Sequence, residues 1–329
     1  MNRSLFLCAA AALLTACSNF TEYSGTPSAG LLIVDPDNLE IVGTLDGIEG
    51  GRALCAGLDN EFFVSSTSGE LHACNASTVT LDTTMVIGPG SSAGYGSMAF
   101  VPMKNSVYII GVLGSILEVD IDDHAVTDEF TVGSSPSCIT PSRSFDFVFV
   151  TDPLNNKVHA VRTTSNTVQK TWLLAHTPTV ILDNTMGSDT LLISTNDSRG
   201  VAYVQPGDFS SPAREVSLPP ASDMARSDFL KLMFTAHPRF GYPTGTVSII
   251  DSLFPAFSVR NTVTIPGNPA FVTTHNDGLH LLILSTGDSD GCTLFSYHLA
   301  LSAFVGSVDL PGTPVDMIMA GNRLVILTY

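Results

Sequence analysis

The stretch Pro136–Leu174, PSCITPSRSFDFVFVTDPLNNKVHAVRTTSNTVQKTWLL, contains four short apolar runs separated by turn residues. The pattern predicts one four-stranded antiparallel sheet, with strands at Ser137–Thr140, Phe147–Val150, Lys157–Arg162 and Val168–Leu174. A single sheet of this size cannot bury both of its faces. Copies at a fixed period therefore predict a closed ring of such sheets, each covered by its two neighbours.

Copies of the unit recur along the chain, which predicts a β-propeller. The repeat units begin about 45 residues apart, a spacing typical of one propeller blade. Their first residues are Gly51, Gly96, Pro136, Pro178, Pro220 and Pro269. In the weakest copy, which starts near Pro220, the first strand is expected at Asp223–Arg226, a polar segment that could form a short helical turn instead, leaving six or eight blades as alternatives.

The two ends of the repeat region complete one another. Leu31–Asp35 and Leu39–Leu45 resemble the third and fourth strands of a blade, and Pro314–Ala320 and Leu324–Tyr329 resemble the first and second. Pairing them closes the ring and leaves no open sheet edge. We therefore expect an all-β, seven-bladed propeller of four-stranded antiparallel blades, forming a single domain over residues 30–329.

The tetrapeptide Phe149-Val150-Thr151-Asp152, followed by an Asn-x-Val-x-Val-like segment, resembles the YVTN-type β-propeller repeats of bacterial and archaeal surface proteins. It departs from that signature at its first and last letters, and the other copies are looser. The resemblance implies the propeller fold and a broad class of envelope proteins. It implies no particular reaction.

The N-terminal segment predicts export. A basic start, an apolar run at Leu5–Leu14 and small residues before Cys17 are typical of a signal peptide over residues 1–16. Leu14-Thr15-Ala16-Cys17 resembles the bacterial lipobox, which implies lipidation of Cys17, whereas the alternative is an ordinary signal with a stray cysteine. Residues 17–29 then form a lipid-anchored tether. By the same resemblance, Ser18 favours an outer-membrane lipoprotein, facing the periplasm or the surface.

Net charge bears on the possible partners, and cysteine spacing bears on disulfide formation. The formal net charge is −17, which disfavours nucleic acid because phosphates would be repelled. Cys55 and Cys74 are expected on the first and third strands of one blade, about 9.5 Å apart and beyond disulfide reach. We therefore expect them, with Cys138 and Cys292, to be free thiols.

The sequence predicts no metal site and no cofactor. Its eight histidines are scattered singly, which favours structural roles. Gly287–Gly291 begins like a calcium loop, with Asp288 and Asp290, but lacks the distal glutamate and is better explained as a tight turn. Gly88–Gly96 lacks the lysine of a phosphate-binding loop.

One connection stands out as a candidate binding site. The loop His237–Gly245 is longer than its counterparts and lies on the face where propellers commonly bind ligands. An unselective surface insertion is the alternative. The candidate ligand-binding residues, all expected near this face, are His237, Arg239, Phe240, Tyr242, His176, Asp152 and Asn155.

Three functions fit these observations. The leading one is a non-catalytic lipoprotein that binds an envelope protein or glycan and is anchored in the outer-membrane lipid through Cys17. An enzyme of lactonase or quinoprotein type is less favoured, because the channel-lining strands offer only Asp223 and Asp316 as candidate acids. An assembly factor with PQQ-type repeats would favour a tryptophan in each blade, and the chain has only Trp172.

Overall fold

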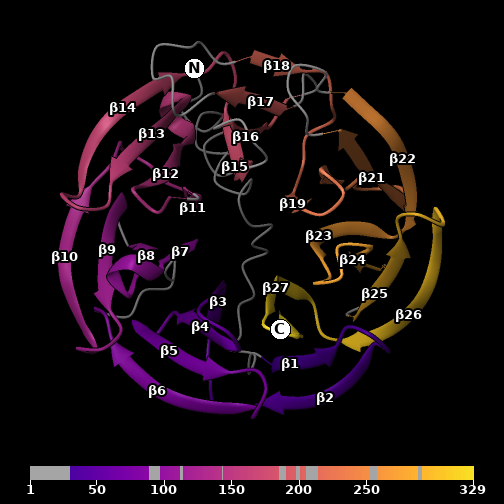
Figure 1. Ribbon diagram of the computed structural model, residues 1–329, viewed down its shortest axis with the longest axis horizontal. Helices are drawn as coiled ribbons and strands as arrows, with labels where there is room; N and C mark the ends of the chain where they lie inside the picture. Colours follow the sequence, from indigo (N-terminus) through magenta and orange to yellow (C-terminus); the bar gives the residue numbers. More distant parts are fainter. Residues whose placement is uncertain are drawn as a thin grey trace, which may run out of the picture.

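The computed structural model describes residues 30–88, 97–111, 114–142, 144–184, 190–197, 201–204, 214–251, 258–287 and 291–329. These residues form seven four-stranded antiparallel sheets arranged in a ring around a central channel (Figure 1). Six sheets consist of four consecutive strands each. The other joins both ends of the repeat region in the order β2-β1-β28-β27, and the propeller prediction is thereby confirmed.

The strands are short, and each blade runs from an innermost first strand to a fourth strand at the rim (Figure 1). In chain order they are β1 (Gly30–Asp35), β2 (Glu40–Leu45), β3 (Gly51–Ala56), β4 (Glu61–Ser66), β5 (Glu70–Asn75), β6 (Thr80–Val86), β7 (Met98–Val101), β8 (Ser106–Ile110), β9 (Ser115–Asp120), β10 (Ala125–Thr131), β11 (Ile139–Pro141), β12 (Phe147–Asp152), β13 (Lys157–Arg162), β14 (Thr167–Leu173), β15 (Pro178–Asn184), β16 (Thr190–Thr195), β17 (Val201–Val204), β18 (Arg214–Val216), β19 (Asp223–Ser227), β20 (Leu232–His237), β21 (Thr244–Asp251), β22 (Ser258–Pro266), β23 (Asn268–Thr274), β24 (His280–Thr286), β25 (Gly291–His298), β26 (Ala303–Pro311), β27 (Pro314–Ala320) and β28 (Arg323–Thr328). Two 3₁₀ turns, η1 (Pro102–Lys104) and η3 (Pro153–Asn155), join β7 to β8 and β12 to β13.

The sheet built from both ends, here called the closing blade, has the predicted composition. β1 pairs antiparallel with β28, from Gly30 opposite Thr328 to Val34 opposite Leu324. The Arg323 guanidinium of β28 also donates to the Asp35 carboxylate of β1, at 2.6 Å. The first and last strands of the described residues, β1 and β28, are therefore hydrogen-bonded neighbours in one sheet.

The hydrophobic core is divided among the spaces between blades. Each buried cluster joins two neighbouring sheets, such as Phe63 of β4 with Phe100 of β7, whose ring centroids lie 5.6 Å apart. Middle strands such as β12 are buried along nearly their whole length, whereas rim strands such as β14 are largely exposed. This burial on both faces explains the continuous apolar runs of the middle strands.

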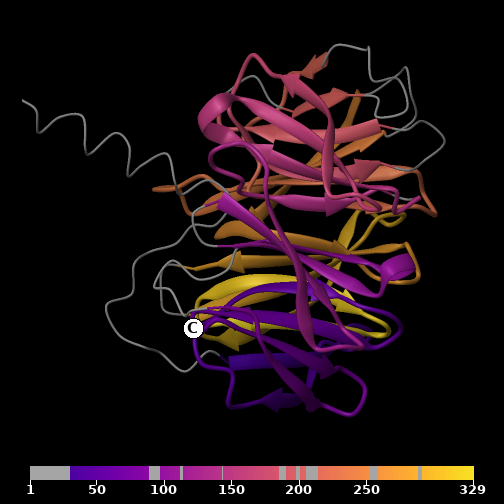
Figure 2. The same cartoon turned by 90° about the vertical axis from the view of Figure 1, so that its left-hand side faces the viewer.

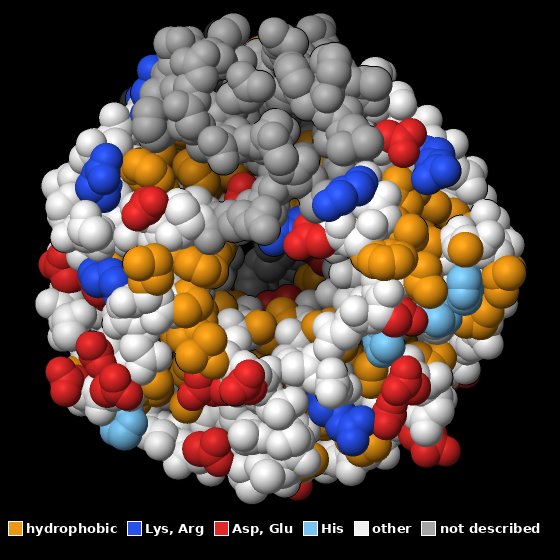
Figure 3. All heavy atoms as spheres, viewed as in Figure 1, with side chains coloured by type: hydrophobic (Ala, Val, Ile, Leu, Met, Phe, Trp, Pro, Cys, Tyr) orange, Lys and Arg blue, Asp and Glu red, His pale blue; other side chains and the backbone are white. Residues whose placement is uncertain are grey.

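The inner strands of the blades run broadly along the axis of the ring, whereas the rim strands curve along its circumference, and the molecule has two ends (Figure 1 and Figure 2). Because neighbouring strands in a blade are antiparallel, the turns after first and third strands lie at one end, here called the hairpin end. Connections after second strands and between blades lie at the other, here called the loop end. Figures 1 and 3 view the same face of the ring, which is hollowed at its centre.

Several boundaries differ from the sequence predictions. The first strand of the central repeat, β11, begins at Ile139 instead of Ser137, although Ser137 and Cys138 already exchange backbone hydrogen bonds with Thr151. Asp223–Ser227 is the strand β19, so the weakest repeat has no helical turn there. The cysteines Cys55, Cys74, Cys138 and Cys292 are free thiols, as expected. Among the described residues, no helix is long and apolar enough to cross a membrane.

Candidate functional site

The predicted binding loop forms an exposed tip at the loop end. It is shorter than expected, because β20 continues through His237 and β21 already starts at Thr244. Phe240 is 67 % exposed and Tyr242 57 % exposed. The Arg239 guanidinium lies over the Tyr242 ring, 4.5 Å from its centroid. Residues 239–242 are here called the tip.

Hydrogen bonds hold the base of the tip in place. The Arg239 N–H donates to the Asn268 side chain of the next blade at 2.9 Å, and the Tyr242 N–H donates to the Arg239 carbonyl at 3.0 Å. Gly241 has φ of +81°, a left-handed conformation that glycine adopts without strain. The tip therefore projects exposed side chains from a fixed backbone.

His237 does not belong to the tip, which corrects the sequence prediction. Its side chain is 1 % exposed, and Nδ1 lies 3.0 Å from the Pro220 carbonyl, to which it donates. Nε2 then accepts from the hydroxyls of Thr235 and Ser248. Burial lowers the pKa of His237, although the Pro220 carbonyl opposes this shift. A neutral, fully bonded imidazole has a structural role here.

Asp152 and Asn155 are also committed to internal contacts. Asp152 is 0 % exposed, and its Oδ2 accepts from the Ser134 N–H at 3.1 Å and from the Asn155 side chain at 2.7 Å. Asp152 Oδ2 also lies 3.7 Å from Nε2 of His159, whose pKa is lowered by burial. Asp152 is therefore buried and does not open on the loop-end face, which corrects its expected role, whereas Asn155 is exposed there and bonds the Ser134 side chain in the connection into β11.

His176 forms a separate ion pair at the same end. Its Nδ1 lies 2.6 Å from Asp197, in the connection after β16. It therefore belongs to the seam between the β11–β14 and β15–β18 blades, whereas the tip contacts the β23–β26 blade through Asn268. The structure distributes the predicted loop-end residues among different blades, and they do not gather into one site.

The two candidate channel acids are used for joining blades. Asp223 accepts from the Met224 N–H at 2.8 Å and from the Val272 N–H of the next blade at 2.9 Å. Asp316 repeats this arrangement with Met317 at 2.8 Å and Leu54 at 2.7 Å. Each carboxylate thus bonds two backbone amides with its two oxygens.

The environment of these acids is apolar enough to disfavour their charge. Burial raises the pKa of Asp316 to about 6 against the opposing hydrogen bonds from Leu54 and Met317. Burial likewise raises the pKa of Asp223 well above its ordinary value, and the charge of Asp316 adds to that shift. Both carboxylates have an evident structural use, tying one innermost strand to the next.

A polar cluster that was not predicted lies at the hairpin end, in the turn between β23 and β24. Its sequence is His275-Asn276-Asp277-Gly278-Leu279-His280. Asp277 Oδ1 lies 3.1 Å from Nδ1 of His275, and Oδ2 lies 2.5 Å from Nδ1 of His280. His275, Asp277 and His280 each offer one ligand atom, and these atoms all lie within 4.8 Å of one another.

The local fold explains this convergence. The His275 N–H donates to the His280 carbonyl at 3.0 Å, and the Gly278 N–H donates to the His275 carbonyl at 2.9 Å. Asp277 Oδ1 also accepts the N–H groups of Leu279 and His280. Burial would raise the pKa of Asp277, but these bonds together with the histidines hold it well below its ordinary value.

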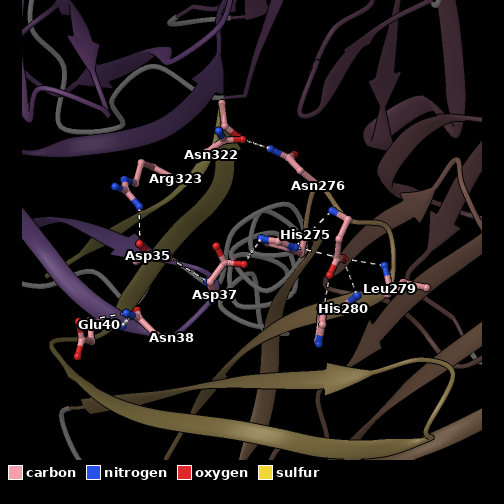
Figure 4. Close-up of polar contacts among 12 residues, drawn as sticks. Asp35, Asp37, Asn38, Glu40, His275, Asn276, Leu279, His280, Asn322 and Arg323 are labelled. Atoms are coloured by element: carbon pink, nitrogen blue, oxygen red, sulfur yellow. Dashed lines mark hydrogen bonds and ion pairs between the residues drawn. The ribbon is translucent and has the colours of Figure 1, made fainter.

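The turn is joined to the closing blade by further polar contacts (Figure 4). The Asp37 carboxylate, between β1 and β2, lies 3.4 Å from His275 Nε2. The Asn276 side chain donates to the Gly321 carbonyl at 2.6 Å and to Asn322 at 3.0 Å. The site therefore spans the seam between the last contiguous blade and the closing blade.

A third histidine and a cavity adjoin the cluster. His298 stands opposite His280 in the β24–β25 pairing, and their ring centroids lie 4.7 Å apart at an interplanar angle of 79°. Histidine side chains gather at the right of the face shown in Figure 3, over the β23–β26 blade. The neighbouring cavity measures about 240 Å³, and its lining includes His275, His280, Ser296 and Ser307.

This gathering corrects the expectation that the histidines act singly. The signal available in the sequence was the spacing His-x-Asp-x-x-His around Asp277-Gly278, a pair typical of tight turns. Asp37 could not be assigned, because it reaches the cluster only through ring closure. Cys17, Asp288 and Asp290 lie outside the described residues, so lipidation of Cys17 and the tight turn expected at Gly287–Gly291 stay predictions.

Comparison with known proteins gives a fold likeness only. No protein-family model and no curated protein sequence matches the chain. Among solved structures, the chain is similar to a chain of Kuenenia stuttgartiensis hydrazine synthase, with a TM-score of 0.68 and 15 % sequence identity. The match covers 85 % of this chain and 96 % of that one. At this identity the likeness supports the β-propeller fold.

Proposed function

We propose that the protein is a lipid-anchored β-propeller of the bacterial outer membrane that binds a protein partner through its loop-end tip. The anchor rests on the signal-like segment and on the lipobox-like Leu14-Thr15-Ala16-Cys17. The binding role rests on one observation: Arg239, Phe240 and Tyr242 are exposed together on a hydrogen-bonded loop.

The chemistry of the tip favours a protein over a glycan. Arginine and tyrosine are enriched where binding energy concentrates in protein interfaces, and aromatic side chains act there as anchors that fill pockets on the partner. Small ligands, in contrast, are usually held in concave sites. Residues 239–243 are all exposed, so the tip projects outward and fits a pocket on a partner surface.

The fixed geometry lowers the cost of binding. The side chain of Arg239 is already stacked on Tyr242, and the backbone at both positions is hydrogen-bonded. Little conformational freedom is therefore lost when the tip docks, which is the advantage of a preorganised interface. The acids of the channel bond backbone amides, so the scaffold role is favoured over the lactonase or quinoprotein alternative.

Site-specific photo-crosslinking in intact cells tests the binding role. A photoreactive residue at position 240 should give a discrete, protease-sensitive crosslinked product. The same residue at Leu154, 64 % exposed at the loop end, or at Met103, 78 % exposed at the hairpin end, should not. The double variant Arg239→Ala, Tyr242→Ala should abolish the product. A product equally strong from all three positions, or one removed only by glycan-degrading treatment, would refute a protein partner at the tip.

A separate experiment tests the anchor. Labelled fatty acid should enter the wild type and should not enter Cys17→Ser, and the labelled protein should sediment with outer membranes. Equal labelling of both proteins would exclude lipidation at Cys17, whatever the outcome of crosslinking at the tip.

A further inference from the structure

We propose that the hairpin end binds one first-row divalent transition-metal ion, with His275, Asp277 and His280 as its protein ligands. The three potential ligand atoms lie within 4.8 Å of one another. An ion with ligand distances of about 2.0–2.2 Å requires ligand atoms separated by at most about 4 Å. The proposal therefore requires the three side chains to draw together by less than about 1 Å when the ion binds.

The hydrogen bonds around His275 point to a cation. The Asp277 N–H lies 3.3 Å from Nδ1 of His275 and donates to it in the tautomer whose ring proton is on Nε2, which is the form that binds a metal through Nδ1. Nε2 faces the Asp37 carboxylate at 3.4 Å, which suits that proton. In that tautomer the lone pair of Nδ1 faces Asp277 Oδ1, 3.1 Å away. A metal ion between the two atoms would be coordinated by both.

The surroundings of His275 have the form of a supported metal ligand. A ligating imidazole commonly donates its other ring N–H to a carboxylate, which fixes its orientation. Asp37 fills that position from the closing blade, and Asp35 in turn accepts the Asp37 N–H at 3.0 Å. Arg323 holds Asp35 at 2.6 Å. The chain of contacts keeps His275 in position before any ion arrives.

The ligand set selects the class of metal. Two imidazole nitrogens and one carboxylate suit Zn²⁺ and its first-row neighbours, whereas Mg²⁺ and Ca²⁺ prefer sites made only of oxygen. Three protein ligands also leave a coordination position open. The cavity of about 240 Å³ lined by Ser296 and Ser307 adjoins His275 and His280, so water or a small anion can occupy that position.

The first test measures metal retention. The full chain in detergent, stripped with a chelator, is dialysed against Zn²⁺ and its bound metal is quantified. We expect one Zn²⁺ per chain, no competition from excess Mg²⁺, and at least a tenfold loss of affinity in His280→Gln. His176→Gln is the matched control, because that histidine also pairs with an aspartate, at the loop end. Circular dichroism confirms that each variant is folded.

Asp37→Asn tests the supporting role separately. Loss of a carboxylate that orients a ligating histidine typically weakens metal affinity by about 10–100-fold. Replacing zinc with Co²⁺ should further give a visible spectrum that shifts when azide enters the open position. If the folded wild type retains no Zn²⁺, or if His280→Gln retains it as well as His176→Gln does, the cluster is only a hydrogen-bonded turn.

Discussion

The hairpin end joins neighbouring blades, whereas the tip at the loop end points away from them. At the turn between β23 and β24, His275 contacts Asp37 of the closing blade, and Asn276 donates to the Gly321 carbonyl of that blade. At the tip, Phe240 is 67 % exposed and only the backbone of Arg239 is bonded to the next blade. The turn between β23 and β24 uses polar side chains for cohesion, whereas the tip leaves its side chains free for a partner.

This difference between the turn and the tip indicates where substitutions can be tolerated. Side chains that bond across a seam contribute to the stability of the ring and to any site built on it. Side chains of the tip contribute little to stability, so they are free to be selected for recognition. The following predictions test this division, beginning with the largest effect.

Removal of residues 314–329 should have the largest effect, because it removes both β27 and β28. β1 then keeps β2 but loses β28, its other neighbour, and the last contiguous blade loses Gly321 and Asn322 as acceptors for Asn276. We expect the melting temperature to fall on the order of 10 °C or more. Replacement of the tip by Asn-Gly should leave it nearly unchanged. An unaltered midpoint after the C-terminal truncation would contradict the role of the closing blade.

A matched pair of glycine substitutions compares the two ends directly. Gly278 and Gly241 both have positive φ, +68° and +81°. A Cβ at Gly278 would lie 2.6 Å from Cβ of Phe229, whereas a Cβ at Gly241 meets nothing within 4 Å. Gly278→Ala should cost about 3–4 kcal/mol, from backbone strain and overlap, and Gly241→Ala about 1 kcal/mol. Chemical denaturation measures the free energy of unfolding of both variants. Equal losses would contradict the predicted difference between the turn and the tip.

The channel acids between the two ends should make stability depend on pH. Because burial raises the pKa of Asp316 to about 6, protonation favours the fold. This contribution is fully present below the unfolded pKa, near 3.8, and is lost as pH rises through about 6. It amounts to about 2–3 kcal/mol. Asp316→Asn should flatten this part of the profile. Parallel profiles for variant and wild type, measured by thermal melts from pH 4 to pH 8, would contradict it.

Phe240→Ser should produce the smallest change in stability. The side chain is 67 % exposed, so its removal should shift the free energy of unfolding by no more than about 0.5 kcal/mol. Urea denaturation checks this value. A loss above about 2 kcal/mol would mean that the tip supports the ring after all.

The sequence was informative wherever a pattern is local. Phe147–Asp152 is buried on both faces and reads as a continuous apolar run, so β12 could be predicted from its residues. The closing blade could be predicted because each end of the repeat region holds half of the four-strand pattern. The exact start of β11 could not, because Pro136 and Ser137 are compatible with either a strand or a connection.

The cluster at the hairpin end depends on distant parts of the chain. His275 and His280 are close in sequence, but His298 reaches them through strand pairing and Asp37 through closure of the ring. The opposite error occurred at His237 and Asp152, which look like loop residues in sequence and are buried in the structure. One polar residue in a sequence does not reveal whether its partners are water or neighbouring strands.

Closure of the ring also sets an order of events during biosynthesis. Gly30 and Thr328 are bonded neighbours but lie 298 residues apart in the chain. At about 5–20 residues per second, β1 waits roughly 15–60 s after its own synthesis before β28 exists. During that interval its free edge is able to pair with other chains. The nascent protein therefore needs a holding chaperone, or rapid assembly of its complete blades, until the final strand emerges.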